Sequence, residues 1–225
     1  MAWRMKTFSW LPISLLLFAA GCREAAQYNT TVGGLPYFNE ATFTPHWLGP
    51  DSDSLATFHR ISPFELIDQQ GEMITEQTFS GKIYIADFFF TSCPGICPKM
   101  TKNMGVLQDE FLEDENVLLL SHSVTPEHDS VPVLKAYAEE NGVVTGKWHL
   151  VTGPQEQIYK LGRKDYFVEE DLGLEKAVDD FLHTENFVLV DQDRHIRGIY
   201  NGLNSASVQQ LIADVHLLEV ALQAP

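Results

Sequence analysis

The stretch of sequence that decides the fold is residues 83–104, IYIADFFFTSCPGICPKMTKNM. Residues 83–90 are apolar except for Asp87, which is typical of a strand buried on both faces. Apolar side chains then recur at helical spacing and predict a helix over residues 98–112. Cys93 and Cys97 lie between the end of this strand and the start of this helix. A helix N-terminus favours the thiolate form of cysteine, which is both a nucleophile and a metal ligand.

Strand and helix patterns alternate on both sides of this stretch. Two short apolar runs around the turn DQQG predict an N-terminal β-hairpin. The further expected strands cover 117–124, 148–151, 187–190 and 196–200, and the further helices cover 131–140, 155–161 and 205–222. This alternation predicts an α/β domain with a central mixed sheet and helices on both faces.

The N-terminus has the layout of a secretory signal. Two basic residues, Arg4 and Lys6, precede an apolar run over residues 8–20, which is shorter than the about 20 residues of a membrane span. The next residues complete the sequence AAGC, ending at Cys22, which resembles a lipoprotein cleavage box with Ala19 in place of the usual leucine. A plain cleaved signal is the alternative.

These features divide the chain into three parts. We expect a lipoprotein-type signal peptide over 1–21, a tether over 22–58 and one domain over 59–225. Lipid on Cys22 would hold the protein in the bacterial cell envelope, facing the periplasm. Scattered aromatic residues in the tether indicate that part of it packs on something.

The number of cysteines and the net charge further limit the possible functions. Lipidation of one of the three cysteines would leave Cys93 and Cys97 as a pair, which in an oxidising compartment is a disulfide, a redox couple or a metal site. The chain carries 31 acidic and 15 basic residues, a net charge of −16. Such a surface repels nucleic acid, so nucleic-acid binding is excluded.

The pattern F-x-x-C-P-x-x-C-P that opens a helix after a strand resembles the Sco/SenC family of thioredoxin-like proteins, over roughly residues 60–222. The family's C-x-x-x-C pair corresponds to Cys93 and Cys97, and its distant histidine to His183 in HTENFVLVD. Its S-V-D-P-x-x-D-T-P segment resembles SVTPEHDSV at 123–131. The resemblance implies a thioredoxin-like fold and copper binding through two cysteines and a histidine. It also implies a role in assembling the binuclear copper centre of cytochrome oxidase, although some members are thiol–disulfide reductases.

Donor chemistry agrees with copper. Two thiolates and an imidazole suit this metal, whereas a structural zinc site would need a fourth protein ligand. His122 and His128 are interpreted as packing or surface residues, and the two methionines that follow Cys97 at helical spacing as core residues. The first hypothesis is therefore a membrane-tethered copper metallochaperone, not an enzyme in the strict sense. Its partner would be the copper-centre subunit of a respiratory oxidase.

The second hypothesis is a thiol–disulfide oxidoreductase that acts on the cysteine pairs of another exported thiol protein. Cys93 would attack the partner's disulfide, Cys97 would resolve the mixed disulfide, and Asp87 would manage the proton. Asp87 could equally cap a strand edge or pair with Lys82. A static structural disulfide is a further alternative, and a thiol peroxidase lacks the sequence context that such enzymes place around their cysteine.

The segment after the strand expected at 117–124 contains two positions to compare with the family's pattern. Thr125 stands where the family has its first aspartate, so this chain lacks that acid. Asp129 keeps the second acid, and we expect it near the site as an orienting or partner-docking carboxylate.

Overall fold

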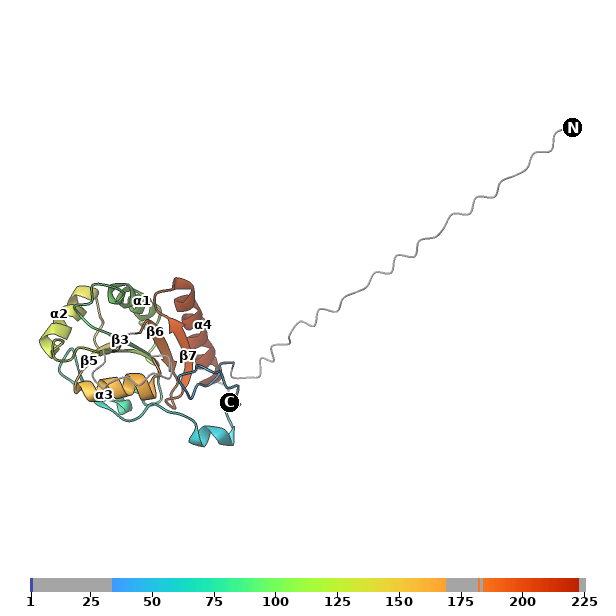
Figure 1. The fold of residues 1–225 in the computed structure, drawn as a ribbon, viewed down its shortest axis with the longest axis horizontal. Helices are drawn as coiled ribbons and strands as arrows, with labels where there is room; N and C mark the ends of the chain where they lie inside the picture. Colours follow the sequence, from blue (N-terminus) through green and yellow to red (C-terminus); the bar gives the residue numbers. More distant parts are fainter. Residues whose placement is uncertain (2–33, 169–181, 183, 223–225) are drawn as a thin grey trace.

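A seven-stranded mixed sheet forms the centre of the protein, with strand order β2-β1-β5-β4-β3-β6-β7. The computed structural model describes residues 1, 34–168, 182 and 184–222 (Figure 1). The strands are β1 (Glu65–Asp68), β2 (Met73–Thr75), β3 (Ile83–Phe89), β4 (Val117–Ser123), β5 (Trp148–Thr152), β6 (Asn186–Val190) and β7 (Ile196–Asn201). The three central strands β3, β4 and β5 are parallel, and the other pairs are antiparallel. The predicted mixed sheet and its N-terminal hairpin are confirmed.

Helices cover both faces of this sheet, as predicted. They are α1 (Cys97–Glu110), α2 (Val131–Asn141), α3 (Gln155–Lys160) and α4 (Ser205–Leu222), with short turns η1 (Asp53–Thr57), η2 (Glu76–Phe79) and the π-helical η3 (Leu161–Asp165). In Figure 1, α1 and α2 lie on one side of the sheet and α3 on the other. Gly142 ends α2 with a left-handed backbone (φ 68°), a conformation that glycine adopts without strain.

Strand β3 has a core on each side, which explains its almost continuous apolar sequence. Ile83, Ile85 and Phe89 pack with the side chains of α1, α2 and α4. The alternate residues between them face the second core, which includes α3. Asp87 follows the first set by this alternation and therefore lies on the face that α1 covers. Met100 and Met104 are fully buried in that first core, so their interpretation as core residues is confirmed.

The segment before the domain packs against the last strand. We call residues 34–47 the arm. Tyr37 of the arm is buried and pairs with His46 through antiparallel backbone hydrogen bonds. The Phe38 N–H donates to the Ile196 carbonyl of β7 at 3.1 Å. Arg197 of β7 also contacts the arm: its guanidinium carbon lies 3.8 Å from the centre of the Tyr37 ring. The expectation that part of the tether packs on the domain is therefore confirmed.

Arg197 also binds the arm's backbone. Its Nη2 donates to the Leu35 carbonyl at 2.7 Å and its Nε to the Pro36 carbonyl at 3.1 Å, while Nη1 pairs with Asp191 at 3.1 Å. A guanidinium group presents its donors in a fixed fork, which suits this kind of multiple contact. The expected signal peptide and Cys22 lie outside the described residues.

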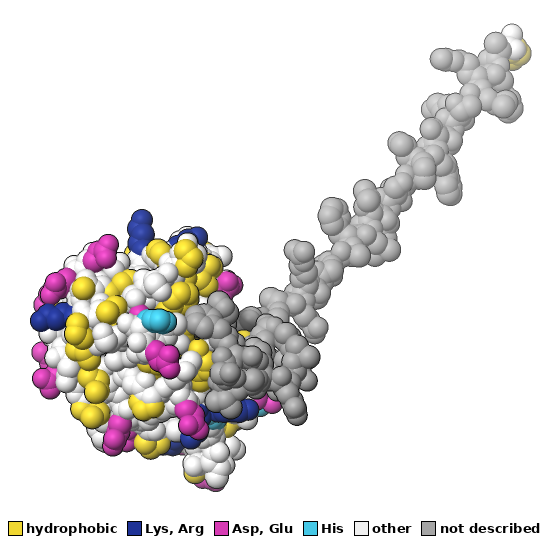
Figure 2. Space-filling model, turned by 60° about the vertical axis from the view of Figure 1, so that its left-hand side comes forward, with side chains coloured by type: hydrophobic (Ala, Val, Ile, Leu, Met, Phe, Trp, Pro, Cys, Tyr) yellow, Lys and Arg dark blue, Asp and Glu magenta, His cyan; other side chains and the backbone are white. Residues whose placement is uncertain are grey.

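The surface is mixed in character. Acidic side chains are scattered among hydrophobic and polar ones over the face shown in Figure 2. None of the helices within the described residues combines the length and the hydropathy that a bilayer span requires.

Candidate metal and thiol-redox site

The two cysteines lie at the end of β3 nearest the first turn of α1. Cys93 is half-buried in the loop after β3, and Cys97 is the first residue of α1 and is buried. Both are free thiols, and they are hydrogen-bonded to each other. At the start of α1, Pro98 has no N–H group and the Lys99 and Met100 N–H groups donate to the Ile96 carbonyl. The backbone N–H groups that act on Cys93 are those of Gly95, Ile96 and Cys97. A close pair of free thiols at a helix N-terminus can chelate a soft metal or exchange disulfides.

The two thiols differ in acidity. Burial is the largest single effect on the pKa of Cys93 and raises it, but hydrogen bonds from the Cys97 thiol and from nearby backbone N–H groups together outweigh burial, so the net pKa lies below the ordinary value. Burial raises the pKa of Cys97 to about 12, and its hydrogen bond to Cys93 adds to this effect. Cys93 is therefore the better thiolate, and Cys97 holds its proton.

Asp129 anchors the loop that carries Cys93. Its Oδ1 accepts a hydrogen bond from the Thr91 hydroxyl at 2.6 Å, and its Oδ2 accepts from the Thr91 N–H at 3.2 Å. The Ser123 and Thr125 hydroxyls donate to the same Oδ2 at 2.6 and 3.0 Å. The side chain is completely buried, so it orients the loop and is not available to dock a partner. Thr125, which replaces the family's first aspartate, serves here as one of its donors.

Asp87 lies in the middle of the sheet. It is 1% exposed, and the Ser121 hydroxyl of β4 donates to its Oδ1. Burial raises the pKa of the Asp87 carboxyl to about 7, and the Ser121 hydrogen bond opposes the rise. Lys82 instead donates to the Glu115 carbonyl at 2.6 Å. The alternatives of a strand-edge cap and of a pair with Lys82 were therefore wrong.

Tyr137 of α2 also lies near the cysteines, although no sequence pattern had singled it out. Its hydroxyl is 2.7 Å from the Thr101 hydroxyl of α1, and its ring centre is 5.4 Å from that of Phe89. The pKa of Tyr137 is raised to about 12, mainly by burial; the Thr101 hydrogen bond opposes the rise, and electrostatic interaction with Asp87 and the two cysteines adds to it. The phenol, the carboxyl group and the two thiols thus share one electrostatic environment.

The three histidines considered in the sequence lie in different parts of the protein. His183 lies outside the described residues, between Leu182, which is buried in the second core, and Thr184, whose hydroxyl accepts from the Asn186 N–H at 3.0 Å. His122 is fully buried and stacks on Phe88 with ring centres 4.6 Å apart. His128 is exposed in the turn before α2. The expectation that these last two are packing or surface residues is confirmed.

No group of three or more histidine, cysteine or acidic side chains within the described part of the chain has the geometry to hold a metal ion. The described part supplies the two sulfurs. A third ligand would have to come from elsewhere in the chain or from a partner.

Comparisons with known proteins show which family and which solved structures the chain is similar to. The SCO1/SenC family model matches residues 52–218. The SCO1 protein homolog of Bacillus subtilis is 30% identical over 159 residues, which are 70% of this chain and 81% of that protein.

Three solved structures are similar in both fold and sequence. A SCO1/SenC family lipoprotein from Bacillus anthracis has a TM-score of 0.62 and 29% identity, covering 72% of this chain and 95% of its own. BsSco, described as a member of the Sco family of cytochrome c oxidase assembly proteins with a disulfide switch, has a TM-score of 0.61 and 28% identity, covering 74% and 95%. Arabidopsis thaliana ScoI with copper bound has a TM-score of 0.54 and 27% identity, covering 69% and 97%. These matches confirm the thioredoxin-like fold, and the chain belongs to the SCO1/SenC family.

Proposed function

We propose that this protein is a copper metallochaperone that holds copper through Cys93, Cys97 and His183 and serves assembly of the cytochrome oxidase copper centre. The observation that carries the proposal is the pair of free, mutually hydrogen-bonded thiols at the start of α1. Sulfur ligands select cuprous copper, and an imidazole helps to accommodate the oxidised ion. The copper-bound Arabidopsis relative and the assembly role named for BsSco support the same function.

Each side chain has a distinct task in this function. Cys93, the more acidic and more exposed thiol, would meet the incoming copper first. Cys97 would follow once its proton has left, and His183 would complete the ligand set from the segment before β6. The ion would then pass to the partner's cysteines by exchange of one sulfur ligand at a time. Asp129 would keep the Cys93 loop in place during this exchange.

Copper titration of the purified protein tests the proposal. The wild type should bind one copper ion, measured by competition with a cuprous chelator, and Cys93→Ser or Cys97→Ser should abolish this binding. His183→Ala should weaken affinity at least about tenfold, the effect expected for loss of one ligand. His128→Ala is the matched control and should bind like the wild type. Unchanged affinity in His183→Ala would remove the imidazole from the ligand set.

A second function, thiol–disulfide oxidoreductase, is favoured by Asp87. A buried carboxyl group with a pKa near 7, on the sheet face that Cys97 also faces, suits proton transfer in disulfide exchange. The disulfide switch described for BsSco shows that the thiols of a relative can be oxidised. Asp87→Asn should slow reduction of a test disulfide while leaving copper stoichiometry unchanged. His183→Ala should do the reverse, so the two variants separate the two functions.

The location is part of the proposal. We infer that residues 1–21 are removed and that lipid on Cys22 anchors the protein in the bacterial envelope, facing the periplasm. The relative from Bacillus anthracis is described as a lipoprotein, which supports this. Cys22→Ser should move the protein from the membrane fraction to the soluble fraction, whereas Cys93→Ser should leave it with the membrane. The partner would be the oxidase's copper-centre subunit or another exported thiol protein.

A further inference from the structure

We propose that Trp47, Leu217 and Val220 form a surface that rests on the lipid bilayer and turns the two thiols away from it. We call these three residues the membrane-contact surface. The inference rests on the proposed location, in which lipid on Cys22 anchors the protein. A lipid anchor alone keeps the domain near the bilayer but sets no orientation, and this surface supplies one.

The first observation is exposure. Within the described residues, five large apolar side chains are at least half exposed. Two of them are Met1, in the expected signal peptide, and Met73 of the hairpin. The other three are Trp47 at 62%, Leu217 at 50% and Val220 at 69%. Single exposed apolar residues are normal on a protein surface, whereas several at one place indicate an interaction site.

Leu217 and Val220 lie beside the start of the arm. A Cβ atom added to Gly34 would lie 4.0 Å from Leu217 Cδ1. Val220 is three residues further along α4 and therefore lies on the same face of this helix. The chain toward Cys22 continues directly from Gly34. The two side chains thus flank the point where the tether leaves the domain.

Trp47 lies at the same place because the arm folds back on itself. The Tyr37 N–H donates to the His46 carbonyl at 2.8 Å and the His46 N–H donates to the Tyr37 carbonyl at 2.9 Å. This antiparallel pair puts Trp47 opposite Pro36, two residues from the start of the arm. Arg197 binds the Pro36 carbonyl and the Tyr37 ring, so the position of Trp47 is fixed relative to β7.

The membrane-contact surface lies at the edge of the sheet opposite to the thiols. β3 and β7 are both antiparallel to strands of one hairpin order, β3 to β6 and β6 to β7, so β3 and β7 run in the same direction. Cys93 follows the end of β3, whereas the arm binds Ile196, the first residue of β7. α4 starts after the end of β7 and returns along the sheet, so its last turns lie beside the arm (Figure 1).

Charge favours an apolar contact with lipid. His216 pairs with Glu219 at 3.0 Å and with Glu110 of α1 at 3.5 Å, so the charged side chains of these last turns pair with one another and leave Leu217 and Val220 uncovered. The net charge of −16 makes anionic headgroups repel the protein as a whole. An indole ring prefers the level of the headgroups, and a weak contact suffices because the anchor raises the local concentration of the bilayer.

Tryptophan fluorescence of the lipidated, copper-free protein in phosphatidylcholine vesicles tests the contact, with bromine on the upper part of the acyl chains as the quencher. Without residues 1–21 the chain has two tryptophans, Trp47 and the buried Trp148. The wild type should lose the emission of Trp47, whereas Trp47→Phe should lose none. Leu217→Glu combined with Val220→Glu should restore the emission of Trp47, because two carboxylates do not enter the interface.

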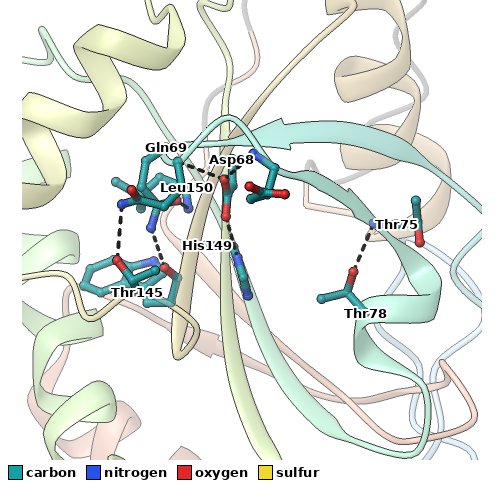
Figure 3. Close-up of polar contacts among 10 residues, drawn as sticks. Asp68, Gln69, Thr75, Thr78, Thr145, His149 and Leu150 are labelled. Carbon is teal, nitrogen blue, oxygen red and sulfur yellow. Dashed lines mark hydrogen bonds and ion pairs between the residues drawn. The ribbon is translucent and has the colours of Figure 1, made fainter.

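The matched control is Met73→Glu combined with Val144→Glu, which also places two carboxylates at exposed apolar positions. Met73 belongs to the hairpin at the other end of the sheet from β7, where Asp68 and His149 join β1 to β5 with Oδ2 and Nδ1 3.0 Å apart (Figure 3). This control should leave the quenching of Trp47 unchanged. A maleimide dye on Cys93 should stay unquenched in the same vesicles, because the thiols lie at the opposite edge.

Unquenched Trp47 in the wild type overturns the proposal, as does equal quenching in the two double variants. A quenched dye on Cys93 overturns the orientation. A blue shift of Trp47 that grows with the concentration of lipid-free Cys22→Ser protein overturns the proposal in favour of a second copy of the chain on this surface. Unmodified Cys22 in mass spectrometry overturns the anchor and this inference together. None of the measurements uses copper, so failure of the metallochaperone function is seen separately in the copper titration.

Discussion

Removal of the Asp129 side chain should destabilise the protein through the loop that carries Cys93. The carboxyl group accepts four hydrogen bonds, two from Thr91 and one each from Ser123 and Thr125, and is completely buried. A typical intramolecular hydrogen bond contributes about 1 kcal/mol net, so Asp129→Ala should lower the free energy of unfolding by about 4 kcal/mol. Asp129→Asn keeps the shape and one acceptor oxygen, so it should cost about 1–2 kcal/mol.

Urea unfolding followed by tryptophan fluorescence measures these differences. Thr125→Val is the matched control, because it removes one of the four donors without changing the volume, and it should cost about 1 kcal/mol. The loss of unfolding free energy should be largest for Asp129→Ala, smaller for Asp129→Asn and smallest for Thr125→Val. The reasoning fails if Asp129→Ala costs no more than Thr125→Val, since the carboxyl group would then not hold the loop together.

Three further outcomes follow from the same structure. Burial lowers the pKa of His122 to about 4 from 6.5, so its contribution to stability is present above pH 6.5 and is lost as pH falls toward 4. The difference in unfolding free energy between wild type and His122→Phe should therefore change by about 3 kcal/mol across this range, and a difference that is independent of pH would contradict it. Iodoacetamide at pH 7 should modify Cys93 at least about ten times faster than Cys97 by peptide mass spectrometry, because Cys93 is the more exposed and more acidic thiol, and equal rates would refute this order. Arg197→Met should release the arm and speed its cleavage by chymotrypsin, with Arg197→Lys between it and the wild type, whereas unchanged cleavage would show that the arm is held in another way.

The architecture was accessible from the sequence because its signals are local. The apolar run at 83–90 predicted a buried strand, and Asn141-Gly142 marked the end of a helix that the structure ends at Asn141. The same local patterns placed Cys93 and Cys97 at a strand-to-helix junction. The face of the sheet on which Asp87 lies was not predicted, because it depends on where α1 packs.

What the sequence could not supply are contacts between distant strands. The hydrogen bonds that join Trp148 to Ser121 and Ser121 to Asp87 depend on β4 lying between β3 and β5, an order that no local pattern records. Arg197 binds backbone carbonyls, and every residue has one, so its role in holding the arm leaves no sequence signature. Asp129 was expected near the site from its motif. That Thr125 would donate to it, in place of the family's aspartate, depends on the side-chain geometry of the turn.

If lipid is attached to Cys22 as proposed, the packing of the arm on β7 limits the distance from the membrane at which the proposed copper site can work. With the proposed lipid on Cys22, only the residues between Cys22 and Gly34 separate the bilayer surface from a segment fixed to the domain. Fully extended, they span at most about 40 Å, which is close to the diameter of a domain of this size. The thiols can therefore reach only partners within about 80 Å of the bilayer, such as proteins embedded in the same membrane or bound to its surface.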